Sequence, residues 1–103
     1  MIRGMYLVVL RRAGPLWDGS KVLEQQAGWG AHATFMDGLV EAGLVVLGGP
    51  LDDDRRVVLA IEAASEEAVR TTLGQDPWSE SHLLIESVEK WTIRLDGRAG
   101  PPG

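Results

Sequence analysis

The chain has 103 residues and a net charge of −5, and 45% of its residues are hydrophobic. A chain of this length forms one domain, which buries only about 60–70% of the surface of its unfolded state. The hydrophobic content excludes a disordered tail, and the acidic charge with ten scattered basic residues argues against a nucleic-acid partner.

The sequence contains no cysteine, which excludes disulfides, a thiol nucleophile and a thiolate metal site. It has no run of about 18 apolar residues, which a membrane span requires. The amino-terminal residues lack the pattern of a signal peptide. We therefore expect no membrane partner and a cytoplasmic location.

The first predicted strand covers residues 5–10 and consists of β-forming residues up to the stop signal at residues 11–15. A loop follows at residues 16–21. The first helix is expected to begin between Val22 and Trp29 and to end near Ala42, with Gly43 as a left-handed cap. Seven residues share one arc of this helix: Trp29, His32, Ala33, Met36, Leu39, Val40 and Gly43.

Residues 44–47 predict a second strand that ends at Gly48-Gly49-Pro50, and residues 57–62 predict a third. Their closeness in the sequence favours an antiparallel pair. The second helix is expected to start after the N-cap Ser65 and to end at Gly74. Residues 75–82 form a loop.

The last predicted strand covers residues 83–95, and neither of its faces is apolar throughout. A β-bulge near Glu89-Lys90 would turn Trp91 toward the apolar side. Residues 1–95 are thus expected to form the domain, and residues 96–103 a disordered tail.

The order of elements predicts an α+β fold of the ferredoxin-like βαββαβ type, with a four-stranded antiparallel sheet and two helices on one face. Two helices cover only one face of such a sheet, but the first three strands are apolar on both faces. The uncovered face would expose a large apolar patch. We therefore expect a homodimer, joined through this face around a two-fold axis.

Two side chains are candidates for chemistry. His32 lies within the apolar arc of the first helix, and an imidazole can act as acid or base near neutral pH. Spacing alone favours a core histidine over a catalytic one. Asp76 lies before Pro77 after the second helix, where a turn residue is the more common interpretation. The spacing does not establish that the two side chains meet.

Other motifs are weak. Asp52-Asp53-Asp54 lacks the glycine and distal glutamate of an EF-hand and predicts a solvated turn. Ser79 and His82 do not make a triad, and two histidines without metal-ligand spacing predict no metal site. Trp29, Trp78 and Trp91 could line a pocket, although aromatic residues of a small domain more often belong to the core.

The chain resembles the YCII-related (YciI-like) family over about residues 5–94. The resemblance rests on residues 29–39, residues 43–51 and Asp76-Pro77-Trp78, in that order. It implies a fold of the dimeric α/β-barrel group. It also implies that His32 and Asp76, which match the family's histidine and aspartate, meet in a cleft between helices and sheet as an acid/base dyad.

One characterised relative is a dehydrochlorinase of a chlorinated hydroxyhydroquinone, and most members have no assigned reaction. The resemblance therefore suggests a cofactor-independent lyase or isomerase acting on a small organic substrate, with no metal and no cofactor. Gly49 and Pro50 would shape the cleft, and Trp29 and Trp78 would form its apolar walls. Two alternatives are a small-molecule binding or regulatory module without catalysis, and a structural domain in which His32 is merely packed.

Overall fold

The computed structural model describes residues 3–98. Its elements are β1 (Gly4–Arg11), a short 3₁₀ helix η1 (Leu23–Gln25), α1 (Trp29–Glu41), β2 (Val45–Pro50), β3 (Arg56–Ala63), α2 (Glu66–Leu73) and β4 (Leu84–Trp91). The four strands form one antiparallel sheet in the order β2-β3-β1-β4, which confirms the predicted α+β class. No helix in the described part of the chain is long and apolar enough to cross a membrane.

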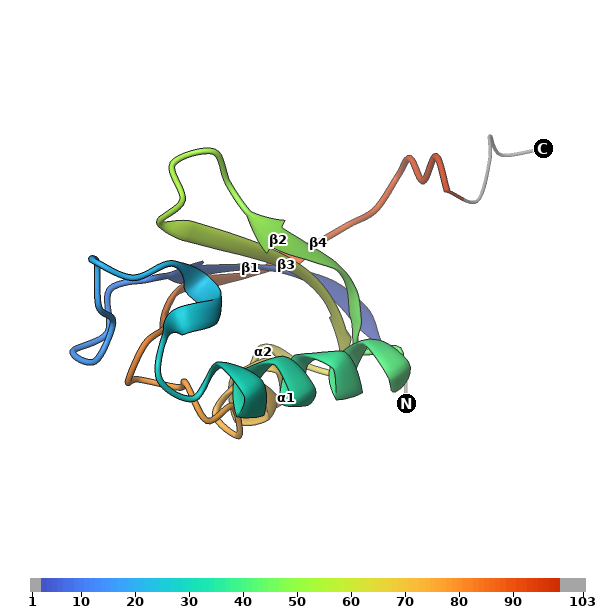
Figure 1. Ribbon diagram of the computed structural model, residues 1–103. Helices are drawn as coiled ribbons and strands as arrows, with labels where there is room; N and C mark the ends of the chain where they lie inside the picture. The colour runs from blue at the N-terminus through green and yellow to red at the C-terminus, as the bar shows by residue number, and fades with distance from the viewer. Residues whose placement is uncertain (1–2, 99–103) are drawn as a thin grey trace.

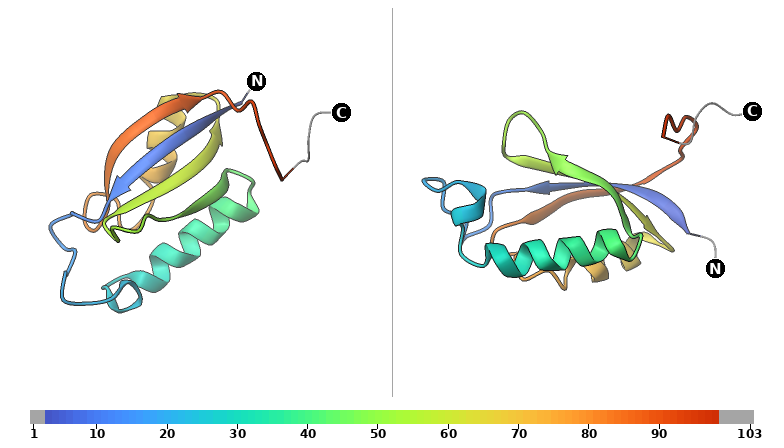
Figure 2. Two further views of the ribbon diagram at one scale, coloured as in Figure 1. Left: turned by 90° about the horizontal axis from the view of Figure 1, so that it is seen from above. Right: turned by 45° about the vertical axis from the view of Figure 1, so that its right-hand side comes forward.

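Both helices lie on the same face of the sheet (Figure 1). Helix α1 packs against the edge strand β2, and α2 packs against β3 and β4, as the view from above shows (Figure 2). The core between the layers contains alternate residues of β1 and β3 and two residues of α2. Its central members are Tyr6, Val8, Leu10, Leu59, Ile61, Val69 and Leu73.

Helix α1 begins at the late end of the expected range. Gly28 precedes it with a φ of 80°, a conformation that favours glycine, and η1 occupies the earlier residues. At the other end Gly43 has a φ of 76°, and the Leu44 amide donates to the Leu39 carbonyl at 2.9 Å. This is a Schellman motif, which confirms the predicted glycine cap.

Helix α2 matches its prediction closely. The hydroxyl of Ser65 accepts a hydrogen bond from the Ala68 amide at 3.1 Å, so Ser65 is the N-cap. Two carboxylates, Glu66 and Glu67, lie in the first turn, where the helix dipole stabilises negative charge. The helix ends at Leu73, one residue before Gly74.

The predicted end of the second strand at Gly48-Gly49-Pro50 is wrong. These three residues pair with Leu59, Val58 and Val57 and belong to β2. A Cβ atom at Gly48 would lie 2.5 Å from a methyl group of Leu59, so glycine allows the close approach of the two strands. Pro50 is tolerated because β2 is an edge strand, which leaves one side of its backbone unpaired.

The last strand ends at Trp91 rather than at residue 95, and its bulge lies at Glu86 rather than near Glu89-Lys90. The register shows this directly, because Val9 pairs with Ser87 whereas Leu10 pairs with Ile85. Trp91 stays on the face away from the helices and is 44% exposed, so no bulge is needed to bury it.

The predicted tail is described only in part. Residues 99–103 lie outside the described residues. Before them, the guanidinium of Arg98 donates to the carboxylate of Asp96 at 2.9 Å.

Candidate functional site

A cleft of about 430 Å³ opens between α1 and the edge of the sheet. Its size lies within the range of small-molecule sites. Most of its lining is apolar and comes from β2, β3 and α1, and its ionisable residues are Arg12, His32 and Asp37. The complete lining consists of Leu10, Arg12, Leu23, Trp29, His32, Met36, Asp37, Val40, Val45, Val46, Leu47, Gly48, Gly49, Pro50, Val57, Leu59, Trp78 and Leu83.

The apolar arc predicted for α1 faces this cleft as well as the core. Of the arc, only Leu39 is buried, whereas Val40 is 57% exposed. Trp29, His32 and Met36 line the cleft together with Val40. The helix therefore stands away from the sheet along one side, and its apolar side chains are available to a ligand.

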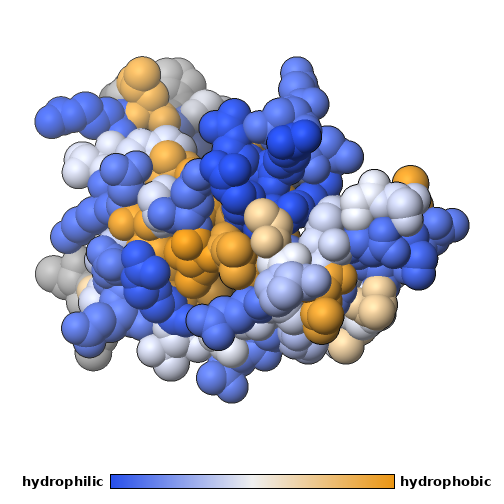
Figure 3. Space-filling view, turned by 90° about the vertical axis from the view of Figure 1, so that its left-hand side faces the viewer, coloured by the Kyte–Doolittle hydropathy of each residue, from blue (hydrophilic) through white to orange (hydrophobic). Residues whose placement is uncertain are grey.

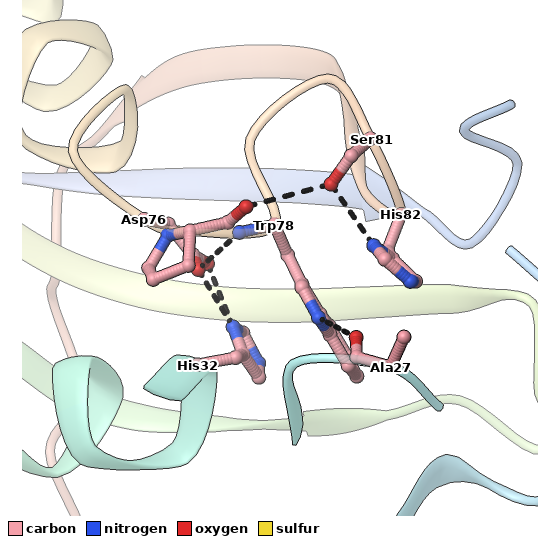
Figure 4. A network of polar contacts seen from close by, with 7 residues as sticks. Ala27, His32, Asp76, Trp78, Ser81 and His82 are labelled. Carbon is pink, nitrogen blue, oxygen red and sulfur yellow. Dashed lines mark hydrogen bonds and ion pairs between the residues drawn. The ribbon is translucent and has the colours of Figure 1, made fainter. Parts of the chain in front are cut away.

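The structure brings His32 and Asp76 into direct contact (Figure 4). Nδ1 of His32 lies 2.8 Å from Oδ2 and 2.9 Å from Oδ1 of Asp76. The side chains are only 11% and 5% exposed, respectively. The loop after α2 makes this contact possible, because it brings Asp76 to the first turn of α1, where His32 lies.

Asp76 also has the turn role that its local sequence predicts. Its Oδ1 accepts a hydrogen bond from the Trp78 amide at 2.9 Å, and its own amide donates to the Leu73 carbonyl at 3.1 Å. The carboxylate is therefore fixed by the backbone before it contacts the imidazole. The turn role and the contact with His32 are compatible.

The contact determines where the proton of a neutral His32 lies. An ionised carboxylate only accepts hydrogen bonds, so Nδ1 must be the protonated nitrogen. Nε2 is then an acceptor, and it makes no hydrogen bond with any residue that the structure describes. His32 lines the cleft, and its contact with Asp76 determines which ring nitrogen is the acceptor.

Trp78 lies between two imidazole rings (Figure 4). The ring of His32 is stacked on it at 4.2 Å and 8°, and the ring of His82 at 4.7 Å and 18°. Trp78 is 1% exposed, and its indole N–H donates to the Ala27 carbonyl at 2.8 Å. The indole is thereby anchored to the segment before α1 and holds the plane of His32.

His82 lies outside the lining of the cleft but stacks on Trp78, and the sequence did not indicate this contact. It is 4% exposed, its Nδ1 lies 2.9 Å from the hydroxyl of Ser81, and its Nε2 is buried without a partner among the described residues. Burial lowers the pKa of His82, and the nearby His32 lowers it further. No local pattern could have revealed this, because His82 meets Trp78 through the fold of the 76–83 loop.

The four residues expected to bind a substrate, Trp29, Gly49, Pro50 and Trp78, all line the cleft. Trp91 does not, because it lies on the opposite face of the sheet. The Asp52–Asp54 segment is a turn as predicted, in which Asp53 accepts hydrogen bonds from the amides of Arg55 and Arg56. These bonds and the Arg56 guanidinium hold the pKa of Asp53 well below its usual range.

The side chain of Gln26 holds the segment between β1 and α1 together by hydrogen bonds. Gln26 is buried, and sequence reasoning missed its role. Its side chain accepts from the Asp18 amide at 2.9 Å and donates to the carbonyls of Asp18 and Lys21. Trp17 packs edge-on against Trp78 with ring centres 6.0 Å apart. The loop therefore forms an ordered wall beside the stacked rings.

Residues 3–98 contain no cluster of three or more His, Asp or Glu side chains that could hold a metal ion. Seen from the end that carries the loop after β1, hydrophobic residues gather in the middle of the surface and hydrophilic residues surround them (Figure 3).

Comparisons of this chain with protein-family models, with curated proteins and with solved structures found no match.

Proposed function

We propose that the chain is a YCII-like, cofactor-independent lyase or isomerase in which His32 transfers a proton on a small organic substrate. The contact between His32 and Asp76 at the wall of an apolar cleft is the observation that carries the proposal. A nearly buried His–carboxylate pair at the wall of a cleft, whose Nε2 makes no hydrogen bond with the described residues, supports a role as a general base.

In this proposal Asp76 is a positioning residue. It holds the Nδ1 proton of His32, so the lone pair of Nε2 is directed at the ligand, and it stabilises the imidazolium that forms when Nε2 takes a proton. The near burial of both side chains strengthens the electrostatic interaction of the pair. No nucleophile is required.

The chemistry balances without a co-reactant. His32 removes a proton from a carbon that is next to a carbonyl or next to a carbon bearing a leaving group. In an isomerase the electron pair of that C–H bond moves into an enol, and the imidazolium returns the proton at another atom. In a lyase the same electron pair forms a carbon–carbon double bond, the leaving group departs with its own bonding electrons, and the imidazolium releases its proton to the leaving group or to water.

The test is proton exchange in D₂O. Small enolisable and halogenated phenolic compounds are incubated with the protein, and deuterium uptake or elimination is followed by NMR. We expect His32→Gln to lower the rate by about 10²–10⁴, the usual contribution of a positioned acid or base. His82→Phe is the matched control, because it removes the second imidazole but keeps a ring against Trp78, and it should retain the activity.

The alternative, a binding module without catalysis, makes the opposite prediction. Compounds that bind in the cleft but are never converted, with affinities that His32→Gln leaves unchanged, would refute the catalytic proposal. A His32→Phe variant as stable as the parent, with no ligand found, would favour a purely structural role, since replacing a buried polar group by an apolar one is often neutral.

We further propose that the sheet is of the ferredoxin-like type and that two copies associate as a dimeric α/β barrel. The support lies on the face away from the helices. There Leu7, Val58, Ala60 and Trp91 surround a hollow of about 340 Å³ together with the end of β2. Leu47 and Trp91 line this hollow and are 59% and 44% exposed, so the apolar surface is continuous across the face.

A second copy of the chain is the occupant that this face fits best. Two-fold pairing would bury the same apolar residues on both subunits with no need for another partner. Residues 47–50 of β2 line both this hollow and the cleft. Dimerisation would therefore fix the edge strand that forms one wall of the site.

A further inference from the structure

The guanidinium of Arg12 is a cationic group that lines the same cleft as His32. Its side chain is 6% exposed, and Nη1 donates to the carboxylate of Asp54 and, at 3.1 Å, to the Asp54 carbonyl. The guanidinium carbon also lies 5.4 Å from the centre of the Trp17 ring. The group is therefore held in place without a ligand.

Only Nη1 of this guanidinium donates hydrogen bonds to residues that the structure describes. Nε is buried and has no partner among the residues that the structure describes, and Nη2 makes no hydrogen bond with those residues either. Nε and Nη2 together form the edge of an arginine that binds both oxygens of a carboxylate side by side. A buried donor without an acceptor is costly, which favours a ligand that supplies one.

The charges around Arg12 restrict the ligand further. The carboxylate of Asp54 is 84% exposed, so water screens its charge, whereas the guanidinium is buried. Asp37, the other carboxylate of the lining, is exposed on α1 and repels a second negative charge. The cleft therefore suits one anionic group attached to an apolar body.

We propose that the site takes a small monocarboxylic acid with an apolar or aromatic body, whose carboxylate pairs with the Nε–Nη2 edge of Arg12. The body then lies against the apolar lining, and its reactive carbon is directed toward His32. This inference rests on the proposed function for the role of His32, but the binding of the acid does not depend on catalysis.

The test compares benzoate with benzamide, which has the same shape without the charge, by calorimetry on the full chain. We expect benzoate to bind at least about tenfold more tightly, the value of a charge-assisted pair of hydrogen bonds. Arg12→Gln should abolish this preference. Arg11→Gln is the matched control, because Arg11 is exposed, pairs with Glu86 and does not line the cleft; it should retain the preference.

A second variant protects the test against misfolding. Asp54→Asn removes the negative charge beside the guanidinium but leaves Arg12 and the bond of Nη1 to the Asp54 carbonyl. Benzoate should therefore bind more tightly to this variant than to the parent protein while the affinity for benzamide stays the same, even if Arg12→Gln fails to fold. Equal binding of the two compounds by the parent protein, or a preference that survives in folded Arg12→Gln, would overturn the inference. So would loss of benzoate binding in His32→Gln but not in Arg12→Gln.

The outcomes separate this inference from the proposed function. Acid binding through Arg12 with no turnover of any acid would refute the catalytic proposal and leave the inference standing. Turnover of neutral compounds, with no preference for acids, would refute the inference and leave catalysis by His32 standing.

Discussion

The carboxylate of Asp76 accepts hydrogen bonds from the amide of Trp78, two residues away, and from Nδ1 of His32, which is 44 residues away. One bond shapes the loop and the other sets the tautomer of the imidazole. A substitution can separate these two roles, because an asparagine keeps the carbonyl oxygen for the amide and replaces the second acceptor with a donor.

We therefore expect Asp76→Asn to fold normally but to reverse the tautomer of His32, so that Nδ1 becomes the acceptor and Nε2 carries the proton. Long-range ¹H–¹⁵N NMR of the ring nitrogens measures this directly. Proton-transfer activity should fall together with the change of tautomer. A variant with Nδ1 still protonated would contradict the role given to Asp76.

His82 makes the stability of the fold depend on pH. Its pKa is lowered in the folded protein, chiefly by burial, so the unfolded chain binds more protons once the pH falls below about 6.5. The free energy of unfolding then decreases as the pH falls from this value toward the lowered pKa of the folded state. The same stability is fully present above the unfolded pKa.

His82→Phe should remove this component. Because it keeps a ring against Trp78 and eliminates the unpaired Nε2, we expect it to match or exceed the parent protein in stability at pH 7 and to gain on it progressively below about pH 6.5. Urea denaturation at several pH values gives the comparison. A parallel pH dependence in both proteins would show that His82 is not responsible.

At the scale of elements, Gly38 within α1 and Gly43 after its end affect the stability of the helix in opposite ways. Gly38 is within the helix and Gly43 has a φ of 76° after its end, and neither would place a Cβ atom within 4 Å of other groups. An added Cβ atom would thus make no close contact at either position, and only the backbone conformation distinguishes the two.

Gly38→Ala should stabilise the protein by up to about 1 kcal/mol, because alanine is the better helix former. Gly43→Ala should destabilise it by about 1–2 kcal/mol, because a side chain disfavours the left-handed conformation. Thermal or urea unfolding of the two variants provides the measurement. Changes of the same sign would contradict the cap.

The boundaries of the strands show where local patterns fail. Gly48-Gly49-Pro50 has the composition of a turn, yet it continues β2 because an edge strand tolerates both the missing side chain and the missing donor. The prediction placed the bulge near Glu89-Lys90 instead of at Glu86 for a related reason. The prediction assumed that Trp91 must be buried, whereas within one chain the outer face of the sheet is open.

At the scale of the whole molecule, the open face gives the proposed dimer its test. Trp91→Glu should leave the single chain folded, since Trp91 is 44% exposed, but place a charge within the proposed interface. We expect the parent protein to sediment with twice the mass of one chain and the variant to dissociate. Leu95→Glu, which changes a side chain that is 86% exposed and lies outside the hollow, should remain dimeric. A parent protein that is monomeric at micromolar concentrations would refute the dimer.

The sequence by itself determined the class of fold and the order of its elements, because strand composition, helix periodicity and the caps at Ser65 and Gly43 act over a few residues. It also singled out His32 and Asp76 as candidates. Only the tertiary structure decided that these two side chains touch, that Trp78 is enclosed by two imidazoles, and that Arg12 borders the same cleft. These contacts join segments separated by tens of residues, and their geometry depends on how the loops after β1 and α2 pack, which no local pattern encodes.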